Sequence, residues 1–418
     1  MKKLLFLLLV VLCANRVLPQ SIPSGASGVF SEIHSLPYDN GTIVYFSYRI
    51  PYNFLVFEKT DNGAYKAGFT LNVEASDSLA KNIKRAGDDK DIVLEEFAKT
   101  NSVKDYVQGV VQIVLNSKET YTISPYFTDK SSFQDFKVRP QKVVYKSPPY
   151  CSPIVIEEAP TVCEQASKIL LANYNGDIPF EEKSFNLILP VKDTSIKFLD
   201  VMVENNGDTV FTGRLSESFL AGIQLTECDK KVIIDFDKKN ETRNFVLKNV
   251  TASIHEGPVT ICILDTAKRI ISSFRLNSVW NNKPFALMNY EYAIKALKFI
   301  ESDNVIDSLL SYASEKYQRV LFDYWKKYEK PGKTKFNKLM TEYYQRVDYS
   351  AMNFRTIGNK NGIETDRGKI YIKYGAPSKT ERTSSEKGKI IEIWLYKSNG
   401  LKFSFVDKTG NGDFTLMK

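Results

Sequence analysis

Hydrophobic and polar residues alternate along most of the first two thirds of this chain. Runs such as TIVYFSYRIPYNFLVFEK and YVQGVVQIVLNS are separated by polar turns, a pattern typical of antiparallel β-strands. We therefore expect a β-sandwich-like domain over residues 28–140 and a second one over 154–278, with ENNGDT as a hairpin turn. The stretch RPQKVVYKSPPYCSP carries four prolines and predicts an extended linker over 141–153.

The hydrophobic period changes from two to 3.6 after Pro284. Apolar residues recur three or four positions apart over three stretches, which predicts a three-helix segment over 284–355. The first stretch starts with Phe285 and Met288 on its apolar face, and the third follows Thr334, which is positioned to cap it. We interpret the aromatic stripes of these helices as core.

A period of two returns in the C-terminal part of the chain, over 356–418. Residues 370–374 read IYIKY, and this alternation predicts a strand. Gly375 and Pro377 are expected to end it, because glycine accepts positive φ and proline has no N–H to donate. Further strands are predicted at IIEIWLY, LKFSFVD and DFTLM. The expected fold class is mainly β, with an α+β C-terminal part that ends in a small antiparallel-sheet module.

The stretch NGIETDRG, directly before this predicted strand, has the residue types of a site. In one interpretation, Asp366 and Arg367 bind a polar ligand and Thr365 supplies a hydroxyl. In the other, Asp366 accepts backbone N–H bonds in a turn, Arg367 packs its stem or bridges to a carbonyl, and Gly368 opens the strand. We favour the second interpretation, in which Gly362–Pro377 turns the chain into a sheet edge and fixes that sheet onto the preceding helices.

The N-terminus has the pattern of a secretory signal peptide over residues 1–20. Lys2 and Lys3 precede ten apolar residues, a run too short to cross a bilayer. We expect an exported chain, located in the periplasm, at the outer membrane or outside the cell, with no transmembrane helix after the signal is removed. Lipidation of Cys13 stays open, although Leu12 stands where a lipoprotein signal has a small residue.

Charge gathers at the C-terminal end. Residues 330–418 hold 18 Lys and Arg against 9 Asp and Glu, which gives this part a net charge of +9. The whole chain has a net charge of +8, so residues 1–329 sum to about −1. A basic module of this kind suits an envelope protein partner or an anionic surface. We expect no nucleic-acid partner, because the chain is exported and its lysines form no groove-filling cluster.

Four cysteines remain after the predicted signal is removed, at 151, 163, 228 and 262. An exported chain permits disulfides. A bond between Cys151 and Cys163 is the first pairing to consider, because the segment between them is short and contains Pro153 and Pro160. Free buried thiols are the alternative.

Sites of other kinds find little support in the sequence. His34 and His255 lie far apart without a cluster of metal ligands or a triad around them, and each is expected at the surface or as a satisfied structural residue. The segment 407–418 imitates the start of a calcium loop, but Lys418 occupies the position that requires glutamate, which favours a hairpin turn. No phosphate loop, dinucleotide glycine pattern or nucleophile elbow is present. We expect no metal, no cofactor and no catalytic residues.

The segment GIETDRGKIYIKYGAP, followed by EIWLY, LKFSFVD and GNGDF, resembles the GWxTD domain of exported proteins of Bacteroidota and related bacteria. The preceding FDYWKKYEKPGKTKFNKLMTEYYQRVDYSAMNF matches the helical segment of that family, and SYRIPYNFLVFEK is similar to its N-terminal β region. Gly362, Thr365 and Asp366 match the motif, whereas Ile363 replaces its Trp. This replacement keeps an apolar residue and removes the indole donor, which favours a packing role for the position.

The resemblance implies an extracytoplasmic protein of unassigned activity, from a family without catalytic residues that transfer to this chain. We therefore expect a non-catalytic exported protein that acts as a binding or scaffolding component of the bacterial cell envelope. One alternative is an envelope hydrolase or carbohydrate-active enzyme that uses paired carboxylates. Another is a carbohydrate- or peptide-binding module, which would present an exposed aromatic platform.

Overall fold

The computed structural model describes residues 29–417 except 40, 80, 82, 103–104, 117–119, 145–148, 159–168, 175–176, 329–333, 358–360 and 386–387. The predicted signal peptide lies outside the described residues. About half of the chain is strand and 21% is helix, with several antiparallel sheets and a few helices in the C-terminal part. The predicted fold class, mainly β with an α+β C-terminal part, is confirmed.

The chain forms two compact units. The first contains residues up to 176 together with 188–198 and 216–246, and the second contains 177–187, 199–215 and 247–418. The segment 154–278, predicted as one domain, therefore contributes strands to both units.

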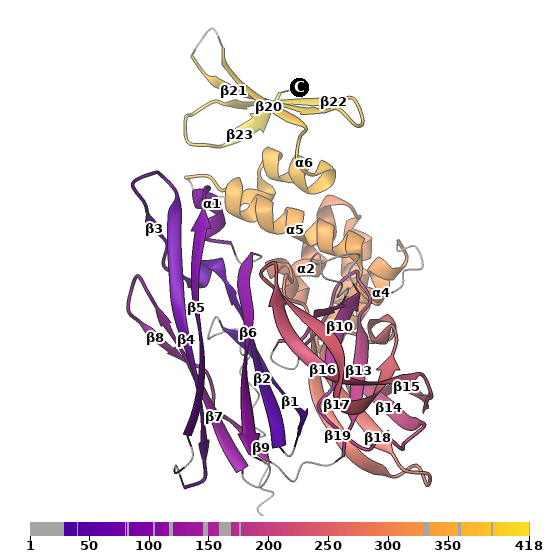
Figure 1. Cartoon of the computed structure of the whole chain (residues 1–418). Coiled ribbons are helices and arrows are strands. Elements are labelled where there is room, and N and C mark those ends of the chain that lie inside the picture. The colour runs from indigo at the N-terminus through magenta and orange to yellow at the C-terminus, as the bar shows by residue number, and fades with distance from the viewer. Residues whose placement is uncertain are drawn as a thin grey trace, which may run out of the picture. The chain divides into compact units, whose positions relative to one another are not determined.

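The first unit is built from three sheets. A middle sheet has the strand order β1 (Phe30–Tyr38), β2 (Gly41–Pro51), β6 (Tyr106–Asn116). A six-stranded sheet lies beside it in Figure 1 and contains β3 (Glu58–Lys59), β4 (Tyr65–Asp77), β5 (Ile83–Leu94), β7 (Thr120–Asp129), β8 (Asp135–Lys137) and β9 (Gln141–Val144). The third sheet contains β10 (Ile154–Glu158), β11 (Ile169–Leu171), β13 (Asn186–Val191), β16 (Ser218–Cys228) and β17 (Lys231–Leu247).

The middle sheet is buried on both faces. Successive side chains of a strand point to opposite faces. Phe46 and Tyr48 pack into a core with Phe69 of the six-stranded sheet, whereas Ile43 and Tyr45 join a core formed with the third sheet. The run of buried residues from 43 to 48 is therefore unbroken, because this strand faces a hydrophobic layer on either side.

The second unit begins with a five-stranded sheet. Its strand order is β12 (Asp177–Pro179), β19 (Ile270–Val279), β18 (Gly257–Leu264), β14 (Leu199–Asn205), β15 (Asp208–Leu215), and β12 runs parallel to β19. Asn206 and Gly207 connect β14 to β15 with φ of 54° and 90°. Positive φ at both positions is typical of a two-residue hairpin, so the hairpin predicted at ENNGDT is confirmed.

The helices of the second unit are shorter and more numerous than the three predicted. They include η4 (Phe285–Met288), α2 (Tyr290–Ala296), α3 (Asp303–Leu310), α4 (Tyr317–Lys326) and α5 (Lys338–Asn353). Phe285 and Met288 are 81% and 65% exposed, so their assignment to the core face was wrong. Asn337, and not Thr334, caps α5 by accepting a hydrogen bond from the Met340 N–H at 2.8 Å. No helix among the described residues combines the length and apolar character needed to cross a membrane.

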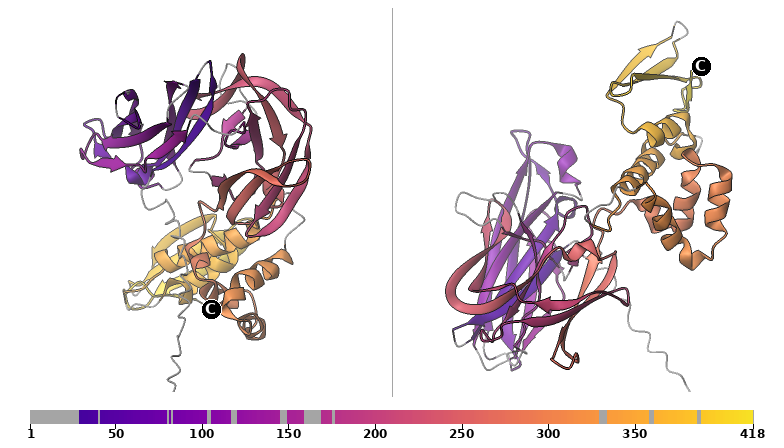
Figure 2. Two further views of the ribbon diagram at one scale, coloured as in Figure 1. Left: turned by 90° about the horizontal axis from the view of Figure 1, so that it is seen from below. Right: turned by 90° about the vertical axis from the view of Figure 1, so that its right-hand side faces the viewer.

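The chain ends in a four-stranded antiparallel sheet, ordered β20 (Lys379–Ser384), β21 (Ile390–Tyr396), β22 (Leu401–Asp407), β23 (Phe414–Leu416). Figures 1 and 2 show this sheet next to α6 (Asp366–Tyr374). Phe354, Trp394 and Phe405 form the centre of the apolar layer on its inner face. The small antiparallel-sheet module is therefore present, with an additional helix in front of it.

A glycine in β16 permits a close backbone contact within the third sheet. The register with β17 shifts between Ala221 and Gly222, and residues 238–241 bulge from β17. A Cβ at Gly222 would lie 1.9 Å from the Lys239 carbonyl oxygen. Such a distance is impossible without moving backbone, so only glycine fits here.

We predict that Gly222→Ala lowers the free energy of unfolding by about 2 kcal/mol, because the new methyl group forces the bulge away from the strand. Gly213→Ala is the matched control, since the atoms nearest to its Cβ belong to the Phe211 ring, which can move, and not to the backbone. Urea unfolding of both variants checks this. Equal stability losses would show that the bulge relaxes freely.

Candidate functional site

The motif segment forms a helix where a strand was predicted. Gly362–Glu364 is a short 3-10 turn, and Asp366–Tyr374 is helix α6. The pattern IYIKY fits either period over so few residues, and the flanking residues decide in favour of the helix. Thr365 caps its start, and Gly375, with φ of 78°, ends it by donating its N–H to the Tyr371 carbonyl. The sheet edge predicted over Gly362–Pro377 is thus wrong, whereas the positive φ expected at Gly375 is observed.

Thr365 organises the turn that precedes α6. Its hydroxyl donates to the Gly362 carbonyl at 2.7 Å and accepts from the Gly368 N–H at 3.0 Å. The residue is 1% exposed. A threonine at this position supplies one of the acceptors that the first turn of a helix lacks. Its hydroxyl is therefore committed to the fold.

The two motif glycines allow three backbone segments to touch. A Cβ at Gly362 would lie 2.0 Å from the Ser350 carbonyl oxygen in α5, and one at Gly368 would lie 1.9 Å from the Gly362 carbonyl oxygen. Any larger residue at either position would separate α5, the turn and α6. Gly368 was predicted to open a strand. It lies inside helix α6 instead.

Ile363 occupies the position of the motif tryptophan. Its side chain is buried in the core of the helical segment, together with Leu297, Val347 and Ile372. A packing position accepts another apolar side chain when its neighbours fill the remaining volume.

Arg367 is a buried cation between two aromatic rings. It is 9% exposed, and its guanidinium carbon lies 4.0 Å from the ring centroid of Phe414 and 5.2 Å from that of Phe354. One terminal nitrogen faces Glu392 at 3.4 Å, and the other donates to the Gly412 carbonyl at 3.2 Å. Burial lowers the pKa of Arg367, and the charge of Glu392 acts in the opposite direction.

Glu392 is the centre of the buried polar network. It is 3% exposed and also accepts hydrogen bonds from Arg382 Nε at 2.9 Å and Trp394 Nε1 at 2.8 Å. The signal for this residue was present in the sequence, because a charged residue interrupts the apolar run IIEIWLY. It was not recognised as part of the site.

Asp366 connects the start of α6 to the last strand. Its carboxylate accepts the N–H of Leu416 at 2.9 Å, rather than bonding within a local turn as predicted. Pro377 lies in the connection between α6 and β20, and the Gly375 carbonyl accepts from the Tyr396 hydroxyl at 2.8 Å. The predicted site residues are thus brought together, and their polar groups point into the module.

Asp407 orders the hairpin between β22 and β23. Its carboxylate accepts from the N–H groups of Thr409, Gly410 and Gly412 at 2.8–3.2 Å. Burial alone would raise the pKa of Asp407, but the backbone donors outweigh it and hold the pKa below its ordinary value. The hairpin interpretation of 407–418 fits this arrangement, and Lys418 lies outside the described residues.

Cys151 and Cys262 agree with the alternative of free buried thiols, whereas His34 differs from expectation. Cys151 and Cys262 are free and buried, so the pairing of Cys151 with Cys163 is wrong; Cys163 lies outside the described residues. Cys228 is disulfide-bonded. His34 is buried in β1, and neither ring nitrogen finds a hydrogen-bond partner among the described residues. Burial lowers its pKa to about 4, so the imidazole is neutral at pH 7.

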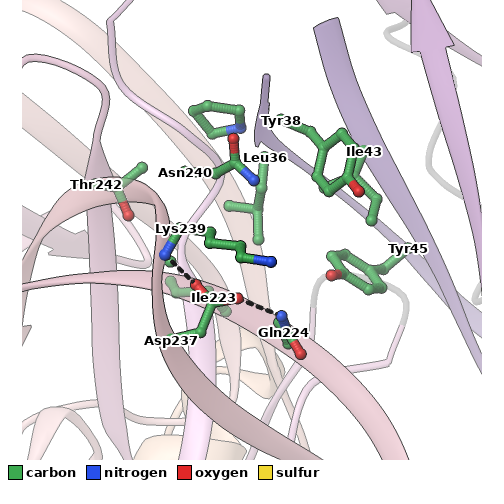
Figure 3. Close-up of a pocket in the computed structure, with 12 residues that line it drawn as sticks. Leu36, Tyr38, Ile43, Tyr45, Ile223, Gln224, Asp237, Lys239, Asn240 and Thr242 are labelled. Carbon is green, nitrogen blue, oxygen red and sulfur yellow. Dashed lines mark hydrogen bonds between the residues drawn. The ribbon is translucent and has the colours of Figure 1, made fainter.

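A small pocket lies in the first unit. Figure 3 shows Tyr38 and Tyr45 on one side and Asp237, Lys239 and Asn240 on the other. Burial, with a smaller effect of Asp237, raises the pKa of Tyr45 to about 12. The described lining contains one carboxylate, that of Asp237, whereas the usual mechanism of glycoside hydrolysis uses two.

Among the described residues, no group of three or more His, Cys, Asp or Glu side chains is placed to hold a metal ion.

We predict that Arg367→Met lowers the free energy of unfolding by about 3 kcal/mol, because it leaves the buried Glu392 without one of its cations. Arg382→Met is the matched control. Arg382 contacts the same carboxylate, but its side chain is 69% exposed, so we expect a loss below about 1 kcal/mol. Denaturant unfolding followed by tryptophan fluorescence compares the two variants. Similar losses of unfolding free energy would contradict a special stabilising role for Arg367.

We predict that Asp407 makes the module acid-sensitive. Because its pKa is lower in the folded state, its contribution to stability is present above the unfolded carboxyl pKa of about 4 and is lost as pH falls through the folded value. Unfolding free energies of the wild type should therefore decrease more between pH 5 and pH 3 than those of Asp407→Asn. Parallel pH profiles would contradict this.

Comparison with known proteins supports the resemblance found in the sequence. No curated protein matches this chain. One similar solved structure is the C-terminal domain of AspA, an antigen I/II-family protein of Streptococcus pyogenes, at 9% identity, with 60% of this chain and 98% of that chain covered and a TM-score of 0.18. This score is too low to support an argument about fold. Residues 267–418, in contrast, match the family model of the GWxTD domain. The C-terminal part of this chain is therefore similar to the GWxTD domain over residues 267–418.

Proposed function

We propose that this chain is a non-catalytic exported protein that acts as a binding or scaffolding component of the bacterial cell envelope. The GWxTD domain is its structural and interaction module. The observation that carries this proposal is the commitment of the motif to internal contacts. Thr365 bonds within its own turn, Asp366 bonds to β23, and Arg367 bonds to Glu392 and Gly412. These groups shape the domain and leave its outer surface to meet a partner.

Two features support export. The apolar run from Leu4 to Cys13 follows two lysines, as in a signal peptide. Cys228 is disulfide-bonded, and disulfides persist mainly in oxidising compartments. The periplasm, the outer membrane and the exterior of the cell all fit these features.

The outer face of the C-terminal sheet is the interaction surface that we propose. This face is opposite to the one that carries Trp394, and its apolar side chains are half-buried: Ile391, Ile393, Leu395 and Val406. Lys379 and Lys402 are the cross-strand neighbours of Leu395 and are exposed. Glu381 lies on the same face and pairs with Lys379 at 2.7 Å, so the rim of two lysines and one glutamate carries a net positive charge. An apolar centre with such a rim suits an acidic envelope protein.

The test is capture of envelope proteins with the purified chain, followed by mass spectrometry. We expect Lys379→Glu combined with Lys402→Glu to abolish capture of the main partner, because both changes place negative charge around Leu395. The melting temperature should stay within about 2 °C, since surface substitutions change stability little.

Lys231→Glu combined with Lys238→Glu provides the control. Both lysines are exposed on β17, and reversing them should leave capture intact. Equal capture by both double variants would exclude the outer face as the binding surface. Turnover of an envelope substrate by the purified wild type would overturn the non-catalytic assignment.

A further inference from the structure

A single arginine lies on the face of the middle sheet that packs against the third sheet. Arg49 is part of β2, the central strand, and its cross-strand neighbours are Phe30 on β1 and Gln108 on β6. Residues directly opposite one another in an antiparallel pair share a face. Tyr106 lies two residues before Gln108 on β6 and therefore belongs to the same face.

Three aromatic rings surround the guanidinium of Arg49. Its central carbon lies 5.2 Å from the ring centroid of Phe30, 4.9 Å from that of Tyr106 and 5.1 Å from that of Tyr174. Tyr174 is held in place because its hydroxyl donates to Gln108 Oε1 at 2.6 Å, and both residues are buried. The cation is thus fixed by attraction to π-faces.

The guanidinium makes no hydrogen bond or ion pair with any residue in the described part of the chain. Acidic residues are present nearby but do not pair with it. Burial, with a much smaller effect of the charge of Glu227, raises the pKa of Tyr174, and the Glu227 carboxylate is bound by Lys90 at 2.6 Å. Arg49 itself is half-buried, so part of the residue remains in contact with solvent.

A guanidinium presents two different surfaces to its surroundings. Its faces attract aromatic rings, whereas its five N–H groups point outward in the plane and require oxygen acceptors. Aromatic rings satisfy the faces and leave the in-plane donors open. A carboxylate is the acceptor whose two oxygens match this fork, and the pairing is strongest where water is partly excluded.

We propose that Arg49 and its aromatic surround bind the carboxylate of an acidic sugar, a uronic acid unit of an anionic polysaccharide. The carboxylate accepts two hydrogen bonds from the guanidinium. The pyranose ring lies against Tyr106, which is 42% exposed and offers a flat surface. This inference deepens the binding role proposed above and rests on it, because the ligand is extracellular.

The position of Arg49 favours a sugar over an extended peptide. A peptide that adds to a sheet needs a free strand edge, but β2 is hydrogen-bonded to β1 on one side and to β6 on the other. Recognition at Arg49 therefore depends on side chains. Aromatic rings beside a single anion-binding group provide contacts for a pyranose ring and its carboxylate.

The experiment measures binding of tri-galacturonate to the purified full chain by calorimetry. The fully methyl-esterified trimer is the matched ligand, since it keeps the sugar rings and removes the negative charges. We expect the ester to bind at least about tenfold more weakly. Acetate and acetyl-Ala-Ala, which carry a carboxylate without a sugar ring, should also bind more weakly than the trimer.

Four variants assign the binding to this site. Arg49→Lys keeps the charge but removes the planar fork, and should weaken binding about tenfold. Tyr106→Ala should weaken it by a similar factor, whereas Tyr106→Phe should not, because the ring is retained. Arg85→Lys, at an exposed arginine that pairs with Glu74, should bind like the wild type.

Two results would overturn the inference. One is equal binding of the trimer and its ester by the wild type, a comparison that stands even if Arg49→Lys fails to fold. The other is tighter binding of acetyl-Ala-Ala than of the trimer, which would assign the site to peptides. The protein-capture experiment uses the C-terminal sheet and does not depend on Arg49, so the two proposals can fail separately.

Discussion

The GWxTD domain depends on one buried cation and the groups that neutralise it. Removing Arg367 from water is costly unless its charge and its donors find partners. These partners come from different elements: Phe354 follows α5, Glu392 is on β21, Gly412 is in the hairpin loop and Phe414 is on β23. The contacts form together only when the helix and the sheet meet in one orientation. Arg367 therefore specifies how the two layers of the domain fit.

The same constraint explains which motif positions tolerate change. Position 363 contributes volume to an apolar core, and a neighbouring side chain can compensate for a smaller residue. Gly362 and Gly368 have no such freedom, because backbone atoms occupy the space where a Cβ would stand. Thr365 supplies a donor and an acceptor at fixed positions in the turn. Gly362 and Thr365 match the motif, and the departure from it falls at position 363.

Sequence patterns predicted the strands well where one periodicity extended over many residues, and failed where short-range alternatives were balanced. IYIKY fits a strand and a helix, and the Thr365 cap and Gly375 decided the outcome. The partners of Arg367 were out of reach because they lie 25 and 45 residues further along the chain. The pairing of Cys151 with Cys163 rested on the short, proline-containing segment between them, and the burial of Cys151 in the core with the third sheet was not visible.

Arg49 and Arg367 show how similar surroundings produce different roles. Both guanidinium groups lie against aromatic rings at 4.0–5.2 Å. In Arg367 the two terminal nitrogens face a carboxylate and a carbonyl of the same domain, so the cation is internal to the fold. No described residue accepts a hydrogen bond from the guanidinium of Arg49, and Arg49 is only half-buried. Stacking against aromatic rings removes part of the hydration from the faces of a guanidinium. Its in-plane N–H groups then form their strongest hydrogen bonds with an acceptor supplied by a ligand. Whether such an arginine stabilises the fold or binds a ligand thus depends on which acceptors lie in the plane of its guanidinium.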